Sequence, residues 1–150
     1  MIEDGITLKR IIVPLDGSDS SFRAAKYAIK VAKMADAEII FMHVVVNPPY
    51  RDARNAGIMI TAYIKEAKEL AELWYLNAGN MASNEDVKFT TETMLDVASA
   101  ADSIVNYAES KKADLIVIGT KGRTGIKRLL LVSVASGVVT HASCPVLVTR

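Results

Sequence analysis

The chain has 150 residues, a length typical of one domain built around one hydrophobic core. Hydrophobic residues make up 51% of the composition and charged residues 23%, which excludes an intrinsically disordered chain. The net charge of +1 excludes a general electrostatic attraction to nucleic acid or to membranes, so we expect neither as a partner.

Three features of the sequence predict a cytoplasmic protein. No apolar run approaches the ~20 residues that cross a bilayer. The segment Met1–Thr7 carries acidic residues where a secretory signal would carry basic ones. The single cysteine, Cys144, excludes an intramolecular disulfide and suits a reducing compartment.

Short apolar segments alternate along the chain with longer segments of helical periodicity. In chain order we predict strand Arg10–Leu15, helix Ser18–Met34, strand Glu38–Val45, helix Ala56–Ala82, strand Val87–Met94, helix Val97–Lys111, strand Asp114–Ile118, helix Ser133–His141 and strand Pro145–Val148. Four of the strands are almost continuously apolar, as in strands covered on both faces. The third alternates and is rich in threonine, which predicts an edge strand.

This alternation predicts one α/β domain over residues 1–150, with a parallel sheet between two layers of helices. In such sheets, ligands bind beyond the carboxyl ends of the strands, where the strand order reverses. We therefore expect a binding site at the ends of the first and fourth strands.

A glycine-rich segment, residues 119–125, follows the fourth predicted strand. Its three glycines allow positive φ angles and a close approach of backbone N–H groups to a ligand. No acidic residue follows Asp114, and four of the five later basic residues surround this segment. Ser133 is expected to cap the last helix, whose free N–H groups attract phosphate. The segment is therefore predicted to bind phosphate; the alternative is a solvated basic turn.

Asp16 directly follows the first predicted strand, in a turn that also contains Gly17 and Ser18. Its carboxylate can accept hydrogen bonds from ribose hydroxyls or from a base amine. The alternative is a turn residue that caps the first helix. Both interpretations stay open on the sequence.

The two histidines are predicted to serve the fold. His43 lies in an apolar strand, where packing or hydrogen bonding is expected instead of general base catalysis. His141 is expected to bond the last carbonyls of its helix. Neither has carboxylate or cysteine neighbours at metal-ligand spacing, so we expect no metal held by the protein alone.

Several segments, taken in order along nearly the whole chain, resemble the universal stress protein family. They are Val13–Ser18, His43–Val44, Ala113–Gly119, residues 119–125, Leu129–Val134 and His141–Val148. The resemblance implies a three-layer α/β domain of the adenine nucleotide alpha-hydrolase-like type. It would have four helices and a five-stranded parallel sheet in the order 3-2-1-4-5.

Nucleotide-binding members of that family carry a glycine, two residues, a glycine, nine residues, a glycine, and then serine or threonine. Gly119, Gly122 and Ser133 match this motif, whereas Val132 replaces its third glycine. The resemblance implies that a bound adenine nucleotide contacts Pro14, Asp16, Val44, Ile118, Gly119, Thr120, Lys121, Gly122, Arg123, Thr124, Gly125, Ser133, Val134 and Ala135.

The resemblance further implies a dimeric stress-response regulator that binds ATP, ADP or AMP, with Mg²⁺ brought by the nucleotide where it is present. The dimer would pair the C-terminal strand, Val146–Arg150, with its copy. No base aimed at a γ-phosphate is evident, so we predict no enzyme beyond slow ATP hydrolysis and no catalytic residue.

Two alternatives stay open on the sequence. Val132 adds bulk and disfavours positive φ, which favours a nucleotide-free dimeric interaction module. An adenylating enzyme of related fold is the other alternative. Asp16–Ser21 loosely resembles a pyrophosphatase loop, but it lacks the paired glycines expected there.

Overall fold

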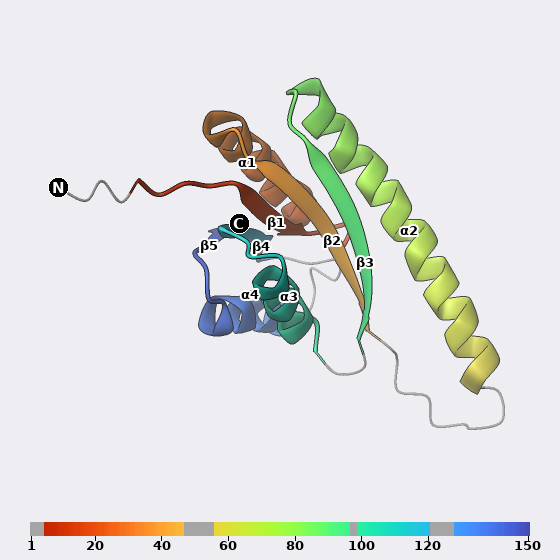
Figure 1. Cartoon of the computed structure of the whole chain (residues 1–150). Helices are drawn as coiled ribbons and strands as arrows, with labels where there is room; N and C mark the ends of the chain where they lie inside the picture. The colour runs from red at the N-terminus through yellow and green to blue at the C-terminus, as the bar shows by residue number, and fades with distance from the viewer. Residues whose placement is uncertain (1–4, 47–55, 97–98, 121–127) are drawn as a thin grey trace.

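The computed structural model describes residues 5–46, 56–96, 99–120 and 128–150, except for the side chains of residues 56, 96 and 128–133. Strands and helices alternate along the chain (Figure 1). Their bounds are β1 Arg10–Pro14, α1 Asp19–Ala35, β2 Glu38–Val46, α2 Ala56–Asn84, β3 Phe89–Asp96, α3 Ala100–Ser110, β4 Leu115–Gly119, α4 Arg128–His141 and β5 Val146–Thr149. The predicted α/β class is confirmed.

The five strands form one parallel sheet in the order β3-β2-β1-β4-β5, as the family resemblance implied. β1 is central: Ile11 and Ile12 are paired on one side with Ile39 and Ile40 of β2. On its other side, β1 pairs with β4. The chain therefore builds the sheet in one direction from β1 to β3 and then crosses back to β4. The reversal of strand order falls at the carboxyl ends of β1 and β4.

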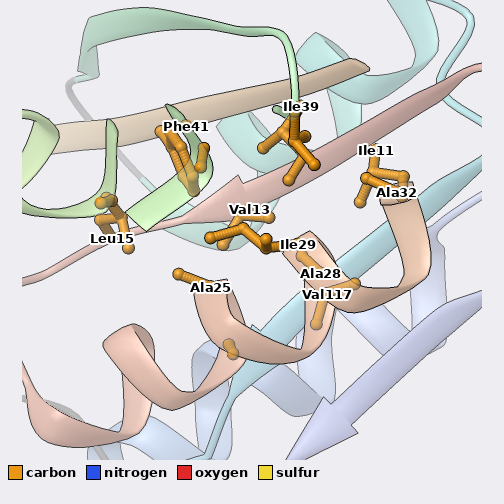
Figure 2. Packing of buried hydrophobic residues seen from close by; sticks show 14 of the residues in the cluster. Ile11, Val13, Leu15, Ala25, Ala28, Ile29, Ala32, Ile39, Phe41 and Val117 are labelled. Carbon is orange, nitrogen blue, oxygen red and sulfur yellow. The ribbon is translucent and has the colours of Figure 1, made fainter. Parts of the chain in front are cut away.

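The sheet is buried on both faces, which accounts for the continuous apolar runs. α1 and α2 cover one face, where Ile11, Val13 and Phe41 are fully buried. Figure 2 shows Ile11 and Val13 pointing toward the alanine-rich face of α1. α3 and α4 cover the other face, against Ile12 and Ile116 (Figure 1). Successive residues of β1 thus enter opposite cores.

Most of the predicted boundaries lie within three residues of the observed ones. The start of α4 differs by more. This helix begins at Arg128, five residues before the predicted start at Ser133. β3 lies at the sheet edge as predicted. Along α2, Tyr63 is exposed and the deeply buried positions are Ala71, Tyr75, Ala78 and Ala82.

Tyr75 joins the middle of α2 to the edge strand. Its hydroxyl donates to the carbonyl of Glu92 at 2.6 Å and bonds the Thr93 Oγ1 at 2.9 Å. The side chain is buried in the core, and this burial raises the pKa of Tyr75 to about 12. The folded state therefore favours the neutral phenol.

We predict that Tyr75→Phe changes how stability depends on pH. The unfolded phenol ionises near pH 10 and the folded one near pH 12, so the native chain loses about 2–3 kcal/mol across that window. The variant lacks this loss, although it is about 1–2 kcal/mol less stable at pH 8 because the part-buried carbonyl of Glu92 loses its donor. Urea unfolding at several pH values measures both; parallel curves for the two proteins would contradict the prediction.

Candidate functional site

A cleft of about 170 Å³ opens at the reversal point of the strand order. It lies at the carboxyl ends of β1, β2 and β4, between the first turns of α1 and α3 and one side of α4. Its described lining residues are Pro14, Leu15, Asp16, Ser18, Ser21, His43, Val44, Ala100, Ile104, Ile118, Gly119 and Val134. Most of this lining is apolar, and the polar atoms gather at the turn between β1 and α1.

The turn after β1 is held by a short chain of hydrogen bonds. Asp16 Oδ1 accepts from the Ser18 amide at 3.0 Å and from the Ser18 hydroxyl at 2.5 Å. The same hydroxyl caps α1 by accepting from the Ser21 amide at 3.1 Å. Asp16 therefore orients the cap without being the cap itself, and its carboxylate is fixed at the cleft wall.

Gly17 lets this turn fit against α2. Its φ of +80° lies in the region that favours glycine, and a Cβ there would overlap the Trp74 indole. Trp74 in turn makes an edge-on contact with the His43 ring, with centroids 4.9 Å apart. Trp74 of α2 thus packs against His43, one of the residues of β2 that line the cleft.

His43 fixes the end of β2 to the turn after β1. Its Nδ1 lies 2.7 Å from the carbonyl oxygen of Leu15. Because a carbonyl can only accept, Nδ1 carries the hydrogen. The predicted role of His43 in packing and hydrogen bonding is confirmed, and the ring also lines the cleft.

Gly119 matters for a reason that differs from the predicted one. Its φ is not positive. A Cβ at this position would instead overlap the Ser20 hydroxyl and lie 2.7 Å from the Ser20 carbonyl oxygen and 2.8 Å from its carbon. The glycine therefore allows the first turn of α1 to lie directly against the end of β4.

The structure brings together six of the site residues named from the sequence: Pro14, Asp16, Val44, Ile118, Gly119 and Val134. Thr120 lies beside β5, where its amide and hydroxyl donate to the carbonyl of Thr149 at 2.9 and 3.2 Å. Ala135 is buried in the core between the sheet and α3. Lys121, Gly122, Arg123, Thr124 and Gly125 lie outside the described residues, as does the Ser133 side chain.

The predicted cap at Ser133 is wrong, because α4 begins at Arg128 and contains residues 132 and 133. The N–H groups left free by a helix belong to its first turn, so those of α4 are upstream of Ser133. Val132 has helical backbone, in which a valine meets no steric conflict of the kind expected at positive φ.

Sequence reasoning missed the residues that two other helix starts bring to the cleft. Ser18 and Ser21 come from the start of α1, and Ala100 from the start of α3. The Ser99 hydroxyl caps α3 by accepting from the Asp102 amide at 3.2 Å. The sequence signal was a serine three residues before an acidic residue, which is typical of a helix start. The N-terminal ends of two helices at the cleft favour an anionic ligand through their dipoles.

Among the described residues, no three side chains of histidine, cysteine, aspartate or glutamate come together in a way that would hold a metal ion. No helix in the described part of the chain is long and apolar enough to cross a membrane. Cys144 packs partly buried beside α4, and burial raises the pKa of its thiol.

A parallel sheet with helices on both faces and a cleft where its strand order reverses defines a doubly wound α/β domain. The model of the Universal stress protein family matches residues 7–150, which is nearly the whole chain. The chain belongs to the universal stress protein family.

Similar proteins agree with this assignment. Universal stress protein MJ0531 of Methanocaldococcus jannaschii is 43% identical over 153 residues, covering 100% of this chain and 87% of that relative. Universal stress protein UspA from Lactobacillus plantarum has a TM-score of 0.75 at 26% identity, covering 95% and 97% of the two chains. A universal stress protein solved in complex with cAMP has a TM-score of 0.69 at 28% identity, covering 96% and 98%.

We predict that Gly119→Ala destabilises the protein by about 1–3 kcal/mol, because backbone atoms of Ser20 must move to admit the methyl group. Gly57→Ala is the matched control. It lies in α2 with nothing within 4 Å of its added Cβ, so it should be neutral or stabilising. Urea unfolding measures both; equal stability of the two variants would contradict this role for Gly119.

Proposed function

We propose that this protein is a cytoplasmic regulator of the stress response that binds an adenine nucleotide in the cleft. The observation that carries the proposal is the position of the Asp16 carboxylate at the wall of a mostly apolar cleft, where the strand order reverses. The complex of a similar family member with cAMP supports it.

The described residues fit the base and sugar of such a ligand. Val44, Ile104 and Ile118 offer apolar surface of the kind that a flat adenine ring covers. Asp16 Oδ1 already accepts two hydrogen bonds from Ser18, so the carboxylate is held in place to accept further donors from a ribose or from the amine of the base.

The size of the cleft bears on the phosphates. Its volume of about 170 Å³ is below the roughly 300 Å³ at which small-molecule sites usually begin. The enclosed part therefore holds only part of a nucleotide, and the phosphates would lie outside it, past Gly119. We therefore propose that AMP and cAMP bind at least as tightly as ATP.

The same residues support binding more than catalysis. The Asp16 carboxylate is hydrogen-bonded to Ser18, which caps α1, and the Nδ1 of His43 is hydrogen-bonded to the Leu15 carbonyl. Both side chains therefore hold the turn after β1 in position. We propose that the protein is not an enzyme, or at most hydrolyses ATP slowly. Any Mg²⁺ would arrive with the nucleotide.

The alternative is a nucleotide-free interaction module, favoured by Val132 at the position of the third motif glycine. The helical backbone there weakens the steric part of this argument. Equilibrium dialysis of the native chain against adenine nucleotides distinguishes the two alternatives.

We also propose that two copies pair through β5. This strand is at the edge of the sheet, with Leu147 and Val148 37% and 39% exposed. Val139 on the neighbouring α4 is also exposed. An apolar edge strand offers unpaired backbone groups and side chains that a second copy can cover.

We predict that equilibrium dialysis detects binding of AMP and cAMP to the native chain. Asp16→Asn should weaken this binding about tenfold or more, because the amide keeps an acceptor for Ser18 but loses the charge that strengthens bonds to the ligand. Asp36→Asn is the matched control: it follows the last residue of α1, far from the cleft, and asparagine tolerates its left-handed backbone.

Two outcomes would overturn this proposal. If ATP, ADP, AMP and cAMP all fail to bind, the nucleotide-free alternative stands. If Asp16→Asn and Asp36→Asn bind as the native chain does, Asp16 does not contact the ligand.

We predict that Val148→Lys converts a dimer into a soluble monomer, because a charge on an edge strand opposes pairing with a second strand. Leu76→Lys, which changes an exposed leucine on α2, should leave the dimer intact. Light scattering during size-exclusion chromatography measures the mass of each. A dimer that survives Val148→Lys, or the deletion of Val146–Arg150, would contradict pairing through β5.

A further inference from the structure

A basic groove of about 580 Å³ lies between α1 and the C-terminal end of α2, and it shares no lining residue with the cleft. Arg23, Lys26, Lys30 and Lys33 line it from α1. Their spacing of three, four and three residues places them in one row along the exposed side of that helix. The buried side of α1 faces the core and consists mainly of alanines.

The positive charge of this row is only partly balanced. Glu85 is the one carboxylate among the described lining residues, so four basic groups against one acid leave a net charge of +3. Glu85 pairs with Lys33 at 2.6 Å. Lys33, with a smaller effect from Lys30, lowers the pKa of Glu85. Within the described part of the chain, no carboxylate lies within ion-pair distance of Lys26 or Lys30.

The fold does not require this arrangement. Like charges three and four residues apart destabilise a helix, and the packing of α1 depends on its opposite side. Arg23 is partly engaged, because its guanidinium donates to the Arg150 carbonyl. Lys26 and Lys30 therefore supply the cations most available to a partner.

The groove also offers apolar surface beside the charges. Ile29 lies buried at its base, and Met81 of α2 is partly buried opposite. Tyr27 is 52% exposed beside Lys26 and Lys30. A ligand that fits must therefore combine negative charges with apolar groups.

We propose that this groove binds an acidic, amphipathic peptide segment of a partner protein. Carboxylates of the segment would pair with Lys26 and Lys30, and an aliphatic side chain would lie over Ile29 and Met81. Residues 23–33 span about 15 Å of helix, which matches four or five residues of extended peptide.

The observations favour a peptide over a polyanion. A nucleic acid or an anionic membrane would gain from only a few cations here and would leave the apolar base of the groove unused. Outside the four lining bases and Glu85, the sequence has 14 basic and 16 acidic residues, a net charge of −2 that opposes a large polyanion but not a short segment confined to the groove.

The test uses the full-length protein and a fluorescein-labelled peptide of about twelve residues that alternates pairs of glutamate and leucine. We expect a change in anisotropy with a micromolar Kd in about 50 mM NaCl, weakening as the salt is raised. Lys26→Glu with Lys30→Glu should weaken binding at least tenfold, and Lys26→Gln with Lys30→Gln by less. Lys65→Glu with Lys68→Glu on the exposed side of α2 is the matched control and should bind as the native chain does.

A peptide with glutamine in place of glutamate should not bind. Amide NMR shifts on peptide addition should concentrate at Ile29 and Met81. The proposal is overturned if the acidic peptide does not bind, or if the groove and control variants bind it equally. It is also overturned if a single-stranded oligonucleotide or phosphatidylglycerol vesicles depend on Lys26 and Lys30 and bind more tightly than the peptide.

Discussion

The first turn of α1 lies against the last residue of β4 so closely that no side chain fits between them. Ser20 occupies the space where a Cβ of Gly119 would lie. This contact places the cap of α1, with Ser18 and Ser21, at the cleft. It also fixes the orientation of Asp16, whose carboxylate is bonded to Ser18. The polar edge of the cleft therefore depends on one glycine in a strand that contributes no polar side chain of its own.

α1 joins this cleft to the rest of the molecule through three different sides. Its N-terminal end meets β4, its alanine side packs against the sheet, and its basic side lines the groove toward α2. Small side chains on the alanine side allow the helix to approach the sheet closely (Figure 2). Lys26 and Lys30 on the charged side face the groove and take no part in this packing, so a partner that binds them need not disturb the core.

Much of the fold could be predicted because both faces of the sheet are buried. Continuous apolar runs such as Ile11–Val13 are typical of strands covered on both faces, whereas the strand order came from the family resemblance and not from the pattern. The start of α4 was missed because the prediction gave weight to the capping preference of Ser133. The leucines at 129–131 favour helix, and they precede that serine. Local preferences competed there, and the longer helical run prevailed.

The site residues could be predicted only where a short segment of sequence determines the local backbone structure, as in a turn. Asp16 was named from its turn, but His43 reaches the cleft through a contact with Leu15, 28 positions earlier in the chain, which no local pattern encodes. The role of Gly119 likewise depends on a neighbour 99 positions earlier in the chain. Val132 lies within α4, where the backbone is helical, so the positive φ that would disfavour a valine does not arise. The first turn of α4 falls at residues 128–131, upstream of this position. α1 and α3 therefore present their first turns to the cleft, whereas α4 reaches it through Val134 in its second turn.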